Sequence, residues 1–142
     1  MTTDRPGDRV DLAYIVPRLT VDDASHFSHL PALLQALAAR RRVAVIAERA
    51  DAGIAIAGVE MCVQRRADRT RLARMLELAT IARRLRRRGC RVFFVRISVT
   101  AGLALGLACP LIGARLYYWT SGQPRRTLPG WTSRPWRRLM GE

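Results

Sequence analysis

The stretch Arg91-Val-Phe-Phe-Val-Arg-Ile97 decides the fold class, because it carries the strongest β-strand signal in the chain. Val, Phe and Ile favour a pleated, buried surface, and this run carries them on both faces of the predicted strand. A strand that is apolar on both faces is typical of a parallel sheet covered by helices on two sides. The same aliphatic character marks residues 12–16, 43–47 and 59–63, and residues 115–119 are predicted as a fifth strand.

Segments with the helical period separate these strands. The first carries Phe27, Leu30, Leu34 and Leu37 on one face, and its Pro31 falls in the tolerated first turn if Ser28 is the N-cap, or kinks the helix if Ser25 is. A second helix is predicted to begin at an Asp68 N-cap and to end at Gly89, and a third is capped by Ser98 or Thr100. Gly102 and Gly106 are predicted to let this third helix approach the sheet closely.

This alternation predicts an α/β fold: a Rossmann-like parallel β-sheet of about five strands flanked by helices in three αβα layers. We assign residues 11–123 to that domain, residues 1–10 to a flexible N-terminus and residues 124–142 to a basic Trp/Arg/Pro tail that is disordered or truncated. Residues 97–114 are uncharged and of nearly membrane-spanning length, but four Gly and Pro residues and the strand before them favour a helix buried against the sheet.

The net charge of +14 suggests a polyanionic partner, but all 25 basic residues are arginine, a bias that a GC-rich gene would produce without selection for binding. We therefore expect no specific nucleic-acid partner and only weak contact with anionic membrane surfaces. Three cysteines without a C-x-x-C pair indicate buried, reduced thiols in a cytoplasmic protein. Peripheral contact with the inner face of the membrane stays open as an alternative location.

Four stretches resemble the N-terminal domain of family-4-type (GT-B) glycosyltransferases: Asp11-Leu-Ala-Tyr-Ile-Val16, His26-Phe-Ser-His-Leu-Pro-Ala-Leu-Leu34, Val92-Phe-Phe-Val-Arg-Ile-Ser98 and Arg115-Leu-Tyr-Tyr-Trp-Thr-Ser-Gly122. The resemblance implies the acceptor-side half of a nucleotide-sugar-dependent transferase, with a sugar or lipid phosphate as acceptor. In that family a C-terminal Rossmann domain binds the donor, and we expect the 142 residues to lack that domain. The chain would then be a fragment or a stand-alone domain that is inactive by itself. The family's glycine-rich turn after the first strand is replaced here by residues 17–24.

Ligands of open α/β sheets bind beyond the carboxyl ends of the strands, near the point where the strand order reverses. The candidate acceptor-binding residues at that edge are Arg18, Thr20, His29, Ser98, Thr100, Ser121 and Gln123, with Arg49 beside Arg18 as a second phosphate ligand. His26 is the candidate acid or base. Each of these has an ordinary alternative as a loop or cap residue.

Because His26 and His29 lack a third ligand, no metal is expected, and no cofactor either. Two other functions stay open. One is a small Rossmann-like module that binds a nucleotide or another anion, and the other is a basic membrane-associated protein.

Overall fold

The computed structural model describes residues 9–20, 29–65 and 68–119. Five strands and three helices follow one another along the chain: β1 (Leu12–Leu19), α1 (Leu30–Ala38), β2 (Val43–Ala50), β3 (Val59–Val63), α2 (Arg71–Arg87), β4 (Val92–Arg96), α3 (Val99–Ile112) and β5 (Arg115–Trp119). The strands form a single sheet in the order β3-β2-β1-β4-β5, and every neighbouring pair is parallel. The predicted Rossmann-like fold is confirmed.

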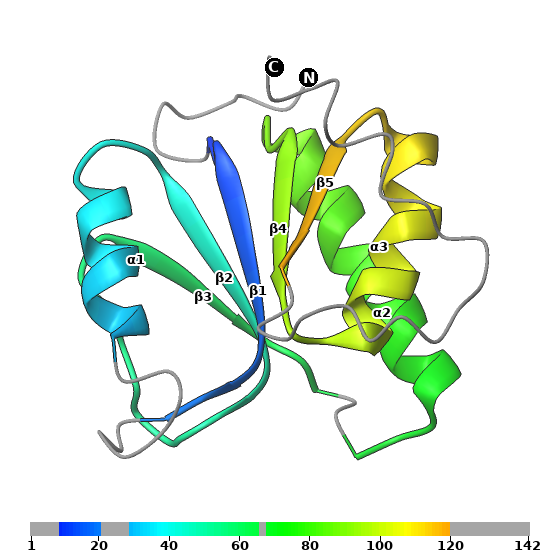
Figure 1. Cartoon of the computed structure of the whole chain (residues 1–142), viewed down its shortest axis with the longest axis horizontal. Coiled ribbons are helices and arrows are strands. Elements are labelled where there is room, and N and C mark those ends of the chain that lie inside the picture. Colours follow the sequence, from blue (N-terminus) through cyan, green and yellow to red (C-terminus); the bar gives the residue numbers. More distant parts are fainter. Residues whose placement is uncertain (1–8, 21–28, 66–67, 120–142) are drawn as a thin grey trace, which may run out of the picture.

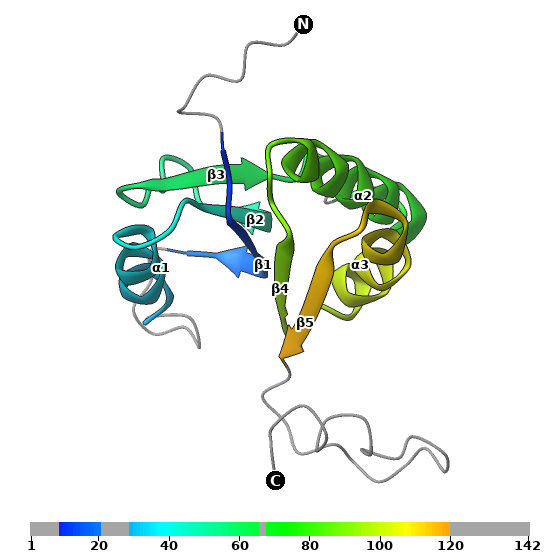
Figure 2. The ribbon, with the colours of Figure 1, turned by 90° about the horizontal axis from the view of Figure 1, so that it is seen from above.

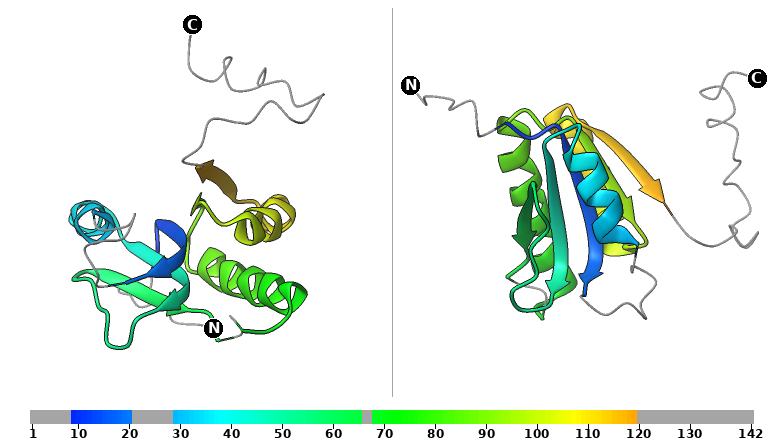
Figure 3. Two further views of the ribbon diagram at one scale, coloured as in Figure 1. Left: turned by 60° about the horizontal axis from the view of Figure 1, so that its bottom comes forward. Right: turned by 90° about the vertical axis from the view of Figure 1, so that its left-hand side faces the viewer.

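Helices cover the two faces of the sheet unequally, giving three layers (Figures 1 and 2). On one face α1 covers β2 and β3, and its Leu30 and Leu34 belong to the same core cluster as Tyr14 and Val16 of β1. On the other face α2 and α3 lie side by side and bury a larger cluster around Phe93. Figure 3 shows α1 alone on its side of the sheet, opposite the α2–α3 pair.

β1 does not end at Pro17, as the proline suggested, but continues to Leu19. Beyond Ile15 it no longer pairs with β4, while Arg18 and Leu19 still pair with Arg49 and Ala50 of β2. Proline lacks an amide hydrogen and is tolerated where one side of a strand has no neighbour. The strand end therefore projects past β4 and helps to shape the carboxyl edge of the sheet.

Two helix starts differ from the sequence prediction. α1 begins at Leu30 with His29 as N-cap, so Pro31 does fall in the tolerated first turn, although no serine caps the helix. The N-cap of α2 is Thr70, whose hydroxyl accepts a hydrogen bond from the Ala73 amide, so Asp68 was the wrong prediction. The Asp68 carboxylate instead pairs with Arg49 of β2, a partner that only folding brings near.

α3 begins at the predicted Ser98 cap, and the prediction that this helix is buried against the sheet holds for one of its faces only. Its inner face carries Ala101, Ala104, Leu105 and Cys109, whereas Val99, Leu103, Leu107 and Leu111 are exposed. The helix has only 14 residues, and within the described ranges no helix has both the length and the apolar character needed to cross a bilayer.

The two glycines of α3 have different surroundings. A Cβ atom at Gly102 would lie 2.8 Å from the ring of Tyr118 on β5, closer than real Cβ contacts, whereas a Cβ at Gly106 would meet nothing within 4 Å. The predicted close-packing role is therefore correct for Gly102 and wrong for Gly106.

We expect Gly106→Ala to raise the free energy of unfolding by up to about 1 kcal/mol, because alanine favours helix and the site is open. Gly102→Ala has the same propensity gain but should destabilise the fold by about 1–2 kcal/mol, because the Tyr118 ring must move. Denaturant unfolding of both variants tests the difference, and Tyr118→Ala should remove the penalty at Gly102. Equal stabilisation by the two alanines would contradict the close contact.

Candidate functional site

The strand order places the point of reversal between β1 and β4. The chain leaves β1 for β2 and β3 on one side and reaches β4 and β5 on the other, so the connections after β1 and β4 diverge. A crevice outside the carboxyl ends of these strands is the usual ligand site of an open α/β sheet. Arg18, Arg96, Ser98 and the start of α3 all lie at this edge.

A buried carboxylate ties this edge together. Glu48 on β2 accepts one hydrogen bond from the Ser98 hydroxyl and one from the Arg74 guanidinium of α2. Because β1 lies between β2 and β4, the Glu48–Ser98 contact crosses the end of β1 near Pro17, which stands opposite Glu48 in the register. Ser98 also accepts a hydrogen bond from the Ala101 amide. The beginnings of α2 and α3 are thereby fastened to the sheet.

Beside this carboxylate lies a hollow of about 460 Å³ over the ends of β1, β2 and β3. Three cationic and three acidic residues line it together with an amide side chain and two apolar residues, namely Arg18, Glu48, Arg49, Ala50, Asp51, Val63, Gln64, Arg65 and Asp68. Its volume falls in the range of small-molecule sites. Charged donors and acceptors set side by side suit a ligand that carries both, such as a hydroxyl-rich molecule.

A second polar group stands at the ends of β4 and α1. The Nε2 atom of His29 lies 3.4 Å from each of the two terminal nitrogens of Arg96. His29 is exposed and Arg96 half-buried, so both side chains lie at the surface of the carboxyl edge. Directly after Arg96, Ile97 has a positive φ of 64°, a conformation that is costly for a β-branched residue. This turn redirects the chain from β4 into α3.

The residues predicted for the site occupy different positions in the structure. The structure brings Arg18 and Arg49 into the hollow, and places His29, Thr20 and Thr100 at the same edge. Ser98 is buried, and its hydroxyl is already engaged by Glu48 and Ala101. His26, Ser121 and Gln123 lie outside the described residues, as do the basic tail and the N-terminal segment.

Sequence reasoning missed several residues of the hollow. Gln64, Arg65 and Asp68 follow β3 by only a few positions, and Gln64 donates a hydrogen bond to the Arg74 carbonyl. Arg96 was read only as part of a strand. Their one available signal was position, because each stands at or just after the carboxyl end of a strand.

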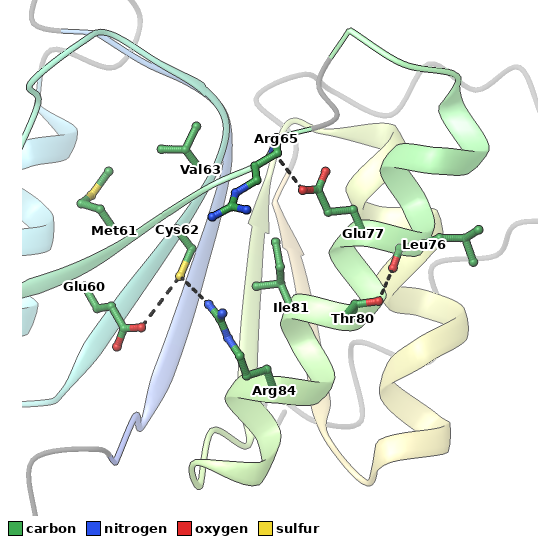
Figure 4. Close-up of a pocket in the computed structure, with 10 residues that line it drawn as sticks. All are labelled: Glu60, Met61, Cys62, Val63, Arg65, Leu76, Glu77, Thr80, Ile81 and Arg84. Atoms are coloured by element: carbon green, nitrogen blue, oxygen red, sulfur yellow. Dashed lines mark hydrogen bonds between the residues drawn. The ribbon is translucent and has the colours of Figure 1, made fainter.

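A different cavity, of about 590 Å³, lies between the edge strand β3 and α2 (Figure 4). Glu60 and Glu77 balance Arg65 and Arg84 along its walls, and the Sγ atom of Cys62 lies 3.7 Å from Arg84 and 3.9 Å from Glu60. Burial, followed by the Glu60 charge, raises the pKa of the Cys62 thiol and outweighs the nearby arginines. The thiol is therefore protonated at neutral pH and is a poor nucleophile.

The other two cysteines are buried in the core beneath α2 and α3. Burial raises the pKa of Cys90 to about 11 and that of Cys109 to about 11. All three thiols are free, and they form no disulfide with one another. Within residues 9–20, 29–65 and 68–119, no group of His, Cys, Asp and Glu has the arrangement of a metal site.

A third hollow, of about 790 Å³, is at the opposite, amino edge of the sheet and is strongly basic. Six arginines line it with one aspartate: Arg9, Arg41, Arg86, Arg87, Arg88, Arg91 and Asp11. Asp11 accepts a hydrogen bond from the Arg42 amide and pairs with Arg9. Among the residues that line the two hollows, charges are thus balanced at the carboxyl edge and mainly positive at the amino edge.

No family model, curated protein or solved structure matches this chain. The fold and the hollow together define the class to which it belongs structurally, a Rossmann-like α/β domain with a polar cavity at the carboxyl edge of a parallel sheet.

We expect Ser98→Ala to destabilise the protein more than Thr70→Ala. Both remove an N-cap, at about 1 kcal/mol each, but Ser98→Ala also takes a hydrogen-bond donor from the buried Glu48. Glu48→Ala should cost about 2–3 kcal/mol, because it leaves the largely buried Arg74 without its carboxylate. Thermal and urea unfolding of the three variants measure how much stability each one loses. Equal losses in the three variants would contradict the predicted order.

The Glu60–Arg88 pair gives a pH-dependent prediction. Two hydrogen bonds of 2.6 and 2.7 Å from Arg88, and its charge, hold the pKa of Glu60 below its ordinary value of 4.5, although burial opposes this. Because the pKa of Glu60 is lower in the folded than in the unfolded protein, this carboxylate stabilises the fold at every pH above its unfolded-state pKa. That stabilisation is lost as the pH falls through the folded-state pKa.

Glu60→Gln should therefore destabilise the protein at pH 7, by less than about 1 kcal/mol because the carboxylate is 36% exposed. The difference from wild type should shrink as the pH falls below 4.5. Denaturant unfolding across that range is the measurement. Asp68→Asn is the control, since its pair with Arg49 is largely solvent-exposed and should contribute little. A Glu60→Gln effect that is independent of pH would show that packing, and not charge, is responsible.

Proposed function

We propose that this chain is the acceptor-side half of a nucleotide-sugar-dependent glycosyltransferase of the GT-B type. The observation that supports this most directly is the mixed polar hollow at the carboxyl edge, where Arg18, Glu48, Arg49 and Asp68 set donors beside acceptors. Sugar hydroxyls both donate and accept hydrogen bonds, so such a lining matches them better than a purely cationic one would. Catalysis on this proposal needs a second, donor-binding domain.

The acceptor proposed for this site is a sugar or a lipid phosphate. Arg96 and His29 contact one another at the same edge of the sheet as the hollow, and Arg18 lines the hollow from the extended end of β1. Arginine forms strong, directional hydrogen bonds with phosphate oxygens, so these residues would hold a phosphate while the hollow holds the hydroxyl-bearing part. A lipid acceptor would place the protein at the inner face of a membrane.

A nucleotide-binding module is the competing function for the same edge. Dinucleotide-binding folds hold the pyrophosphate at a glycine-rich turn between the first strand and its helix. Here β1 runs through Pro17 to Leu19, and residues 17–24 contain no glycine. Without a glycine in this turn, the backbone amides cannot approach a phosphate closely. This favours an acceptor-binding site over a nucleotide-binding site at this edge.

Isothermal calorimetry with glucose, glucose 1-phosphate and geranyl phosphate tests the proposal. The phosphate-bearing probes should bind. Arg96→Ala or Arg18→Ala should each lower the affinity for these probes by about tenfold or more, because each removes a charged hydrogen bond. Arg40→Ala is the matched control, an exposed arginine after the end of α1 and near the amino edge. UDP-glucose should bind weakly, and no sugar transfer is expected from the chain alone.

Two results would contradict this function. If UDP-glucose or another nucleotide binds more tightly than the three acceptor probes, and Arg18→Ala weakens it, the edge is a nucleotide site. If Arg40→Ala weakens the phosphate probes as much as Arg96→Ala does, the binding reflects net charge and not this edge.

A further inference from the structure

The outer face of α3 is apolar along its whole length and is not covered by any described element. Val99, Leu103, Leu107 and Leu111 recur every four residues and are 66%, 59%, 70% and 86% exposed. We call these four residues the α3 stripe. Gly106 and Pro110 are exposed beside them, and no residue of α3 carries a charge. A helix that is apolar on all sides normally lies in an apolar environment.

The α3 stripe ends at the basic hollow of the amino edge. The Arg86 Nε atom donates a 3.0 Å hydrogen bond to the Ile112 carbonyl at the C-terminus of α3, and Arg86 also lines the hollow. Arg115 lies three residues beyond the end of α3, and its amide donates a hydrogen bond to the carbonyl of Arg91, another lining residue. The C-terminal end of the α3 stripe therefore lies next to the arginine cluster.

We infer that α3 and the amino-edge arginines together dock the protein on an anionic lipid surface. The inference deepens the proposed function, and it rests on that function only for placing an acceptor at a membrane. A phospholipid offers hydrocarbon for the stripe and phosphate for the arginines at the same boundary, as interfacial helices require. The stripe spans about 18 Å, too short to cross a bilayer, so α3 lies in the plane of the interface.

Charge argues against a second copy of the chain as the occupant. Each copy carries +14, so two copies repel one another, and in a parallel α3 dimer the two arginine clusters would also meet. Of the six arginines, Arg9 pairs with Asp11 and Arg88 pairs with Glu60, so the cluster keeps a net positive charge. A nucleic acid would neutralise the arginines with its phosphates but leave the aliphatic α3 stripe in water. An anionic lipid surface offers phosphate to the arginines and hydrocarbon to the stripe.

The test is co-sedimentation of the full chain with vesicles, either pure phosphatidylcholine or with about 30% phosphatidylglycerol, across a salt series. Binding should require the anionic lipid. Leu107→Glu should weaken it by roughly tenfold or more, because a large apolar side chain no longer leaves water. Arg87→Glu should also weaken it and flatten its dependence on salt.

Two matched variants control for these changes. Leu33→Glu places the same substitution at an exposed leucine of α1, on the other side of the sheet. Arg71→Glu reverses a charge at the far end of α2, about 24 Å from Arg87 along the helix. Both should bind the anionic vesicles within about twofold of wild type. Far-ultraviolet circular dichroism and thermal unfolding establish that each variant is folded.

A fluorescent probe distinguishes insertion from adhesion. An environment-sensitive label on Leu107→Cys should shift to the blue on anionic vesicles, while the same label on Leu33→Cys should not. The native thiols compete little for the label, since all three are buried. Phosphatidylglycerol carries a phosphate that the acceptor hollow could also bind, so Arg18→Ala, a change in that hollow, is compared with Leu107→Glu. Loss of vesicle binding in Leu107→Glu but not in Arg18→Ala would separate the α3 face from the acceptor site.

Three outcomes would overturn the inference. Equal vesicle binding by Leu107→Glu and Leu33→Glu would mean that arginines alone adhere to the surface. A lipid-free dimer that Leu107→Glu dissociates would make a second copy the occupant. Binding to a soluble polyanion such as heparin that vesicles cannot displace would assign the arginine cluster to another ligand.

Discussion

The enclosure of β1 is the constraint on which the rest of this structure depends. Its two edges pair with β2 and β4, and its two faces are covered by different helices, so residues from Ala13 to Val16 are buried. Tyr14 and Val16 contact the α1 side, while Ala13 and Ile15 contact the side of α2 and α3. Because each flanking element packs against β1 or a strand paired with it, the position of this strand fixes the strand order and the point where it reverses.

The two ends of the sheet consequently have different electrostatic character. At the carboxyl edge Glu48 receives hydrogen bonds from Arg74 and Ser98, and the arginines of the hollow are matched by acids. At the amino edge, helix and loop ends contribute six arginines, of which Arg9 pairs with Asp11 and Arg88 with Glu60. Arginine near the C-terminus of a helix is favoured by the helix dipole, which explains Arg86 and Arg87 at the end of α2. The same residue type therefore builds a neutral polar cavity at one end and a cationic surface at the other.

α3 connects these two ends and gives the proposals a common geometry. Its first residue follows the Ser98 cap at the carboxyl edge, and its last turn is bonded to Arg86 at the amino edge. Gly102 brings the helix against Tyr118, so its inner face is in close contact with the sheet. The two proposals therefore concern opposite ends of the sheet that this one helix spans.

The sequence by itself determined the strands, the helices and their parallel, three-layer arrangement, because hydrophobic period and Gly or Ser caps are local properties. It also placed Arg18, Arg49 and His29 at the carboxyl edge of the sheet, where the structure has them. Only the tertiary structure decided the role of residues that look alike in the sequence. Thr70 caps α2 while Asp68 pairs with Arg49, and Gly102 packs against Tyr118 while Gly106 faces solvent. The apolar run of α3 could not show that its outer face is open, because burial depends on neighbours that are distant in sequence.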